Sequence, residues 1–290
     1  MVAANDIDRL PPVVPPVGAT RTDWRREVRP AAAFSWLRAG WRDFIDRPGL
    51  SLVYGAFVFV VSLLIIGGLF RFGYDYILFP ALSGFLVVGP LIATGLYEKS
   101  RRLAEGTPVT LASMMLVKVR SGGQILFVGV LLCMLMLLWT RAAVFLYAIF
   151  FGMLPFPGLN DIVNILTATP RGWALIVVGS LVGGLFAAFS FAISVFAVPM
   201  LLAERTDALT AMGRSMALVW NNRPVMVTWG AIVTGLIALS LGTALLGLIV
   251  VFPVLGHATW HVYTAMRPRK ADATGEKLRA DVEAFDGAAP

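Results

Sequence analysis

Residues 224–266 read PVMVTWGAIVTGLIALSLGTALLGLIVVFPVLGHATWHVYTAM, a run of 43 residues that holds no Asp, Glu, Lys or Arg. At 1.5 Å per residue, one helix of that length would be ~65 Å long, about twice the ~30 Å hydrocarbon core of a bilayer. The run therefore predicts two membrane-spanning helices. We expect the turn between them near residues 240–247, where Gly242, Thr243 and Gly247 loosen the chain.

Four further apolar runs, each long enough to cross a bilayer, come before this stretch. The composition agrees with them, because 58% of the 290 residues are hydrophobic, 14% are charged and the mean hydropathy is +0.79. These values exclude a soluble protein. We expect an all-α, polytopic transmembrane helix bundle over residues 31–266. The six expected spans are 50–70, 76–97, 124–152, 173–203, 224–243 and 246–266.

The segments outside the spans are polar. Residues 1–30 are expected to form a disordered cytoplasmic leader, because their prolines come with few core-forming residues. Residues 31–47 are expected to form an amphipathic helix at the membrane interface, ended by Pro48 and Gly49. Residues 267–290 are expected to be a cytoplasmic tail. The helical spacing over 31–47 is carried by Phe34, Leu37, Trp41, Phe44 and Ile45.

The basic residues predict the orientation. With both termini inside, 21 of the 24 Lys and Arg residues fall on the cytoplasmic side, and only Arg71, Arg141 and Arg171 fall outside. This asymmetry is typical of a multi-pass protein of the bacterial inner (cytoplasmic) membrane. It also accounts for the net charge of +7, so no nucleic-acid partner is expected. The expected partners are membrane lipids and other membrane proteins.

Two loops on the expected cytoplasmic side carry amphipathic helix signals. Thr107 is expected to cap one helix, with Pro108 at its first position, and Asp207 is expected to cap the other. The sequence SMMLV at 113–117 matches SMALV at 215–219 in four of five positions, each between two spans. A parallel internal repeat or a chance match would both account for this similarity.

The two histidines, His257 and His261, lie four positions apart in the last expected span and so share one helix face. That spacing suits a metal or haem site, although no third histidine exists to complete it. The alternatives are an interfacial aromatic belt with Trp260 and Tyr263, polar tips bonded to a neighbouring helix, or proton handling. The single cysteine, Cys133, cannot form an intrachain disulfide or a cysteine cluster. No other cofactor is expected.

No phosphate-binding loop, zincin motif or nucleophile with a base is present, and no acidic residue lies mid-span. Gly179 and Gly183 predict close helix packing within the fourth span. We therefore expect no enzyme, but a structural or accessory membrane component that binds protein or lipid partners. One alternative is a transporter or channel for a small or amphipathic solute, suggested by the possible repeat and by Pro90 and Pro199 inside spans. The other is a redox-associated protein that binds metal or haem.

Across residues 34–263 the chain resembles an uncharacterised bacterial family of predicted six-helix integral membrane proteins, a domain-of-unknown-function family. The matching pieces are GWRD at 40–43, Pro48 followed by SLVYG at 51–55, and residues 253–263. The resemblance implies a six-helix inner-membrane protein without an assigned activity. Some members are labelled as similar to cytochrome c oxidase subunit I. Such a subunit needs histidines on several helices, whereas both histidines here lie on one.

Overall fold

The computed structural model of the chain describes residues 24–117, 121–152 and 156–267 and is all-helical over these residues. Six of its helical segments are long and apolar enough to cross a membrane, which confirms the expected polytopic bundle. The spans comprise α2 (Pro48–Arg71), α3 (Leu78–Ile92) with α4 (Thr94–Ala104), α6 (Gly122–Phe151), α8 (Pro170–Ser194) with α9 (Ala197–Ala203), α11 (Arg223–Gly242) and α12 (Leu248–Met266). The shorter elements are α1 (Ala32–Ile45), the 3-10 turn η2 (Asp75–Ile77), α5 (Leu111–Met115), α7 (Leu159–Ala168) and α10 (Ala208–Asn221).

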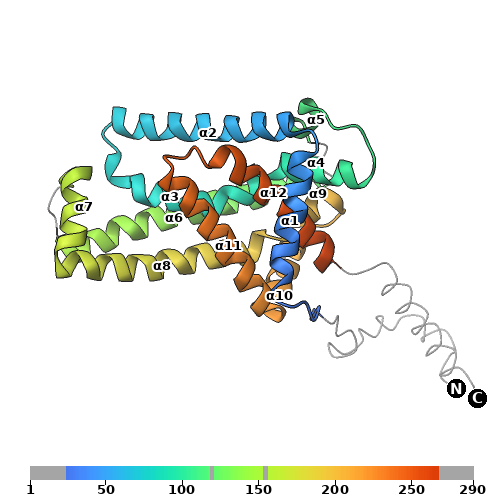
Figure 1. Ribbon diagram of the computed structural model, residues 1–290. Helices are drawn as coiled ribbons and strands as arrows, with labels where there is room; N and C mark the ends of the chain where they lie inside the picture. Colours follow the sequence, from blue (N-terminus) through green and yellow to red (C-terminus); the bar gives the residue numbers. More distant parts are fainter. Residues whose placement is uncertain (1–23, 118–120, 153–155, 268–290) are drawn as a thin grey trace, which may run out of the picture.

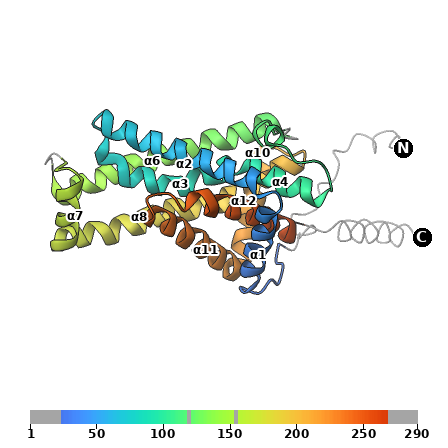
Figure 2. The same ribbon diagram turned by 45° about the horizontal axis from the view of Figure 1, so that its top comes forward.

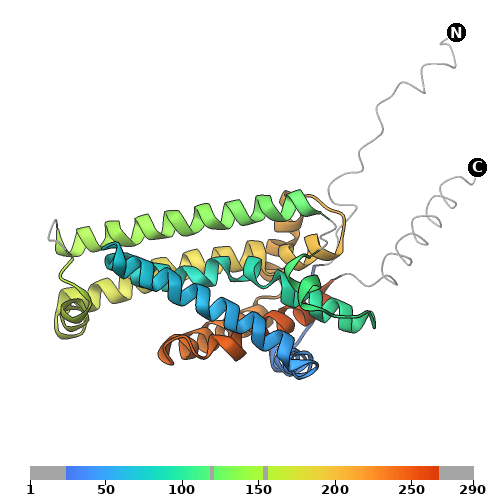
Figure 3. The ribbon, with the colours of Figure 1, turned by 90° about the horizontal axis from the view of Figure 1, so that it is seen from above.

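Short helices lie across the two ends of the bundle (Figure 1). In Figure 3, α1 (blue) and α7 (yellow-green) are seen nearly end-on, whereas α6 and α8 run lengthwise. The end that carries α1, α9 and α10 is called the α1 end below, and the opposite end is called the α7 end. Most of the leader expected over residues 1–30, and nearly all of the tail expected over 267–290, lie outside the described residues.

Helix α1 packs against α12 through a glycine. A Cβ atom added to Gly40 would come within 2.5 Å of the backbone nitrogen of Ala258, so only glycine permits this approach. Trp36 and Phe44 are buried, whereas Phe34 and Trp41 are exposed. A helix that lies across the end of the bundle with apolar side chains exposed is what an interfacial helix requires.

Two of the spans are broken. The second changes from α3 to α4 at Ala93, and the fourth changes from α8 to α9 at residues 195–196, each near a proline of the expected span. The second of these breaks falls four residues before Pro199. A proline has no N–H to donate to the carbonyl four positions earlier, and its ring clashes with that carbonyl, which explains the break.

The last two spans form a hairpin whose turn lies where the glycines predicted it, over residues 243–247. Ala244 and Leu245 adopt positive φ angles of 50° and 70° in this turn. The hairpin stops short of α7, and α11 runs obliquely to the other spans (Figures 1 and 2). Helix α12 lies at the centre, in contact with α1, α2 and α4.

The caps of the end helices were predicted in part. The Asp207 side chain accepts a hydrogen bond from the Thr210 backbone N–H at 2.8 Å and so caps α10, as expected. The expectation for Thr107 is wrong, because Thr110 caps the short helix α5 by accepting from the Ser113 backbone N–H. Helix α7 was not expected at all.

Candidate functional site

His257 is fully buried among polar side chains at the α1 end. Its Nε2 atom lies 3.0 Å from Ser51 Oγ on α2, and its Nδ1 atom lies 2.9 Å from Ser100 Oγ on α4. The backbone oxygen of Leu96 lies 3.2 Å from the same Nδ1 atom. The imidazole therefore joins α12 to both neighbouring helices through hydrogen bonds, as one of the sequence alternatives expected.

The buried side chain of Lys99 determines the direction of these hydrogen bonds. Its Nζ atom donates to Ser51 Oγ at 2.8 Å and to the backbone oxygen of Asp46 at 2.6 Å. Because an ammonium group can only donate, the Ser51 hydroxyl is left to donate its own proton to His257 Nε2. His257 is accordingly assigned as the tautomer that carries its proton on Nδ1.

The polar contacts end at Asp43, whose carboxylate lies on α1. His261 Nε2 donates to Asp43 Oδ2 at 2.8 Å, and the Ser100 hydroxyl lies close enough to the same carboxyl to lower its pKa. Burial raises the pKa of Asp43, but the interactions with His261 and Ser100 outweigh this effect, so its pKa lies below the ordinary value. Because a carboxyl with a lowered pKa stabilises the fold in its ionised form, this contribution is lost only in acid, as the pH falls through that lowered pKa.

Six side chains form one polar cluster, called the polar chain below: hydrogen bonds join the first four, and Ser100 of these adjoins the hydrogen-bonded pair of Asp43 and His261. In order, its members are Lys99, Ser51, His257, Ser100, Asp43 and His261. They come from α1, α2, α4 and α12, so the network joins the end helix α1 to three membrane spans. Every buried donor in it has an acceptor, which is the condition under which buried polar groups stabilise a fold.

The two histidines do not share partners. Both ring nitrogens of His257 contact α2 or α4, whereas His261 reaches Asp43 on α1. Within residues 24–117, 121–152 and 156–267, no group of three or more His, Cys, Asp or Glu side chains is arranged to hold a metal ion. A metal or haem site at His257 and His261 stays a prediction.

Trp260 and Tyr263 do not stand in the headgroup region, because both are buried in the protein. The Tyr263 hydroxyl donates to Glu204 Oε1 at 2.5 Å, although solvated pairing with Arg205 would have been the ordinary reading of Glu204. The aromatic-belt alternative is therefore wrong for these two residues. They are core residues of the α1 end.

A large groove lies towards the α7 side of the polar chain, between α3, α6, α8 and α11. Its volume is about 1210 Å³. Helix α8 borders it from Leu175 to Phe191, which corresponds to about 24 Å of helix. The lining residues include Phe79, Pro80, Ser83, Val87, Trp139, Ala143, Tyr147, Ile162, Leu166, Gly179, Gly183, Gly184, Ala187, Met226, Val227 and Arg223.

Small residues of α8 create the space in this groove. A Cβ atom added to Gly179 or Gly184 would meet nothing within 4 Å. At Gly183 the added atom would come within 2.8 Å of the Trp139 ring. The prediction of close helix packing is therefore right for Gly183 and wrong for Gly179, which faces open space.

The lining of the groove is mostly apolar, and some of its polar side chains bond within the protein. The Trp139 indole N–H donates to Ser83 Oγ at 2.8 Å, and the Thr167 hydroxyl donates to the backbone of its own helix. Among the described residues that line the groove, Arg223 is the only charged one. Such a lining suits a hydrocarbon chain with a polar group at one end.

A second, smaller cavity of about 70 Å³ lies between α3, α11 and α12. Trp229 borders it, and its Nε1 atom is buried without a hydrogen-bond partner in the described part of the chain. No member of the polar chain borders either cavity.

The comparison with protein families matches one segment of the chain. Residues 78–203, which run from α3 to the end of α9, match the family described as Predicted integral membrane protein (DUF2189). Over this segment the chain is similar to that family. The DUF2189 segment holds Lys99, Ser100 and three walls of the groove, whereas α1, α11 and α12 lie beyond it. Neither the comparison with curated proteins nor that with solved structures found a match.

Most of the polar chain could not be predicted from the sequence. Ser51 and His257 are separated by 206 positions, and Ser100 and His257 by 157. Lys99 had counted only as one of the basic residues that set the orientation. A lysine and a serine next to the end of an apolar span were the only hint, and many exposed residues share that position.

Proposed function

We propose that this chain is a non-enzymatic membrane component that binds a membrane lipid in the groove between α8 and α11. The observation that carries the proposal is the groove itself, about 1210 Å³ of apolar space inside the membrane-spanning part, with Arg223 as the one charged residue in the described part of its lining. Ligand pockets for small molecules usually measure ~300–1,000 Å³. The groove is larger, and its length along α8 of about 24 Å matches an extended acyl chain with its headgroup better than a compact solute.

The surroundings of the groove favour lipid over water. Van der Waals contact with a fitted hydrocarbon chain stabilises such a site, whereas polar solutes would lose their hydrogen bonds to water without replacement. Ser83 and Thr167, which line the groove, already bond within the protein.

The burial of the polar chain supports the non-enzymatic part of the proposal. Ser51 Oγ and His257 Nε2 lie at a distance typical of a nucleophile and its base. However, both side chains are fully buried, and neither borders the groove or the smaller cavity. A network of this kind is better suited to fixing four helices relative to one another.

We place the α1 end in the cytoplasm as part of the same proposal. Of the described basic residues, all but Arg71, Arg141 and Arg171 belong to α1, α4, α10 or the segments beside α1 and α9, begin α11 (Arg223) or follow α12 (Arg267). The positive-inside rule then assigns this end to the cytoplasmic face.

Filling the groove is expected to abolish lipid retention. In Gly184→Leu the new side chain enters space in which a Cβ atom meets nothing within 4 Å, so the fold is preserved while the groove is blocked. Native mass spectrometry of the protein extracted from its own membrane should show a lipid-mass adduct on the wild type. We expect the fraction of protein that carries the lipid adduct to be at least fivefold smaller in Gly184→Leu, because the acyl chain of the lipid no longer fits the groove.

Gly235→Leu is the matched control. Gly235 lies on α11, has open space around it and does not line the groove. Its substitution adds the same apolar volume to a membrane span and should leave the adduct unchanged. The proposal fails when wild type carries no lipid, or when both variants lose it equally.

The breaks at Ala93 and at residues 195–196 keep transport of an amphipathic solute as a second candidate, and Ala93 and Val195 border the smaller cavity. Broken helices are a common feature of transporters. This alternative also stays a prediction, as does the redox alternative.

A further inference from the structure

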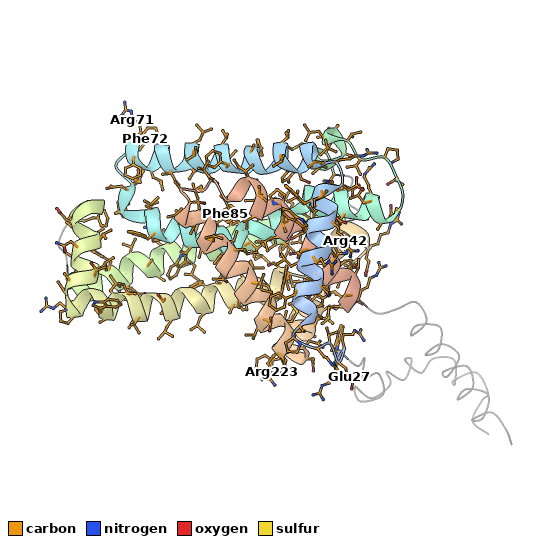
Figure 4. The ribbon with its side chains drawn as sticks, in the orientation of Figure 1. Glu27, Arg42, Arg71, Phe72, Phe85 and Arg223 are labelled. Carbon is orange, nitrogen blue, oxygen red and sulfur yellow. The ribbon has the colours of Figure 1, made fainter. Side chains whose placement is uncertain are left out.

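We infer that the lipid bound in the groove is an anionic phospholipid whose phosphate contacts Arg223 at the α1 end. The inference rests on the proposed function and adds the charge and orientation of the ligand. Arg223 is the first residue of α11, and it borders the groove beside Val219 and Met226. Figure 4 shows it at the foot of α11, at the end opposite Arg71.

Among the residues that the structure describes, no carboxylate forms an ion pair with Arg223. The ion pairs within residues 24–117, 121–152 and 156–267 connect Arg101 to Glu98 and Glu105, Arg102 to Glu98, and His261 to Asp43. The Arg223 guanidinium instead lies 4.8 Å from the centre of the Trp220 ring. This contact orients the guanidinium by a cation–π interaction and leaves its N–H groups available to an anion.

The position of Arg223 is fixed by its neighbour. Asn222 donates through its side-chain amide to the backbone oxygens of Trp24 and Leu218, at 2.7 Å and 2.9 Å. Its side-chain oxygen accepts from the Arg26 backbone N–H at 2.8 Å. The start of α11 is therefore held to both the N-terminal segment and α10, so the guanidinium has a defined place at the mouth of the groove.

Arg223 lies at the level in the bilayer where lipid phosphate groups are found. Trp220 is exposed immediately before the span begins, which is where tryptophan prefers the headgroup region of a bilayer. A phosphate held there would leave its acyl chain to run along α8 towards the α7 end. The positive end of the α11 helix dipole adds to the attraction.

Because none of the described lining residues is acidic, the groove favours a headgroup with a net negative charge. A zwitterionic headgroup carries an ammonium group as well as a phosphate, and none of the described lining residues is a carboxylate that would pair with it. An anionic headgroup needs only the guanidinium. Charge-assisted contacts of this kind correspond to roughly tenfold or more in affinity.

The test uses the full chain, delipidated in detergent and titrated with phosphatidylglycerol or phosphatidylcholine of identical acyl chains, with binding followed by native mass spectrometry. Wild type is expected to prefer phosphatidylglycerol by about tenfold. Arg223→Gln should bind the two lipids about equally, and Arg223→Lys should keep most of the preference. Arg214→Gln removes an exposed arginine of α10 that does not line the groove, so it should behave as wild type.

The experiment distinguishes failure of the Arg223 assignment from failure of the lipid site itself. Equal binding of both lipids by wild type, or a preference that survives in Arg223→Gln, overturns the assignment to Arg223 while the groove remains a lipid site. Binding of neither lipid overturns the proposed function and this inference together.

Discussion

Replacing Ser51 with alanine is expected to lower the free energy of unfolding by about 2–4 kcal/mol, although it removes a single oxygen atom. That oxygen accepts a hydrogen bond from Lys99 and bonds His257, and all three side chains are fully buried. Without it, a buried ammonium group loses an acceptor and a buried imidazole loses a donor. Unfolding in detergent micelles by added SDS would measure the loss.

The control lies on the same helix. The Ser62 hydroxyl donates only to the backbone oxygen of Val58, four positions earlier in α2, so Ser62→Ala should change stability by less than about 0.5 kcal/mol. In a protein that already carries Lys99→Met, Ser51→Ala should lower the free energy of unfolding by less, because the Lys99 and Ser51 side chains interact directly. A double-mutant cycle with Lys99→Met that shows no coupling would argue against the polar chain.

Replacing Gly40 with alanine is expected to detach α1 from α12 and to cost about 2–3 kcal/mol. The added Cβ atom would lie 2.6 Å from the backbone oxygen of Val254 and from the Ala258 Cβ, and backbone atoms cannot rotate away. Since Asp43 lies on the same helix, the separation should also break its hydrogen bond with His261. The rate of limited proteolysis within α1 would report the detachment.

Gly49→Ala provides the comparison for this effect. Gly49 lies in the first turn of α2, where an added Cβ atom meets nothing within 4 Å, so alanine should be neutral or stabilise the helix by up to ~1 kcal/mol. Equal proteolysis rates in Gly40→Ala and wild type would show that α1 does not dock in the way described.

The sequence predicted those features that depend on local composition. Long apolar runs identify spans because a bilayer has a fixed thickness, and the glycines near residue 242 identified the hairpin turn. Residue spacing along one helix, by contrast, does not reveal what the helix packs against. His257 and His261 share a face, yet their partners come from three different helices, so the pair looked like a metal site when read alone.

The groove was also invisible in the sequence, for a different reason. Small residues spaced four apart predict close packing, and Gly183 does pack on Trp139. Whether the next small residue faces a neighbour or open space depends on the oblique course of α11, which the pattern of α8 does not encode. Glu98 illustrates the same limit, because its place just beyond an apolar run does not reveal that it is buried and bonded to both Arg101 and Arg102.

Photo-cross-linking in the native membrane tests the lipid site most directly. Benzoylphenylalanine would replace Phe79, which lines the groove and is 45% exposed, or Phe57, which lies on α2 away from the groove and is 53% exposed. The account predicts that the probe at position 79 captures one class of anionic phospholipid, enriched several-fold over its share of the membrane. The probe at position 57 should capture lipids in their bulk proportions. The same bulk mixture at both positions would contradict a specific lipid site in the groove.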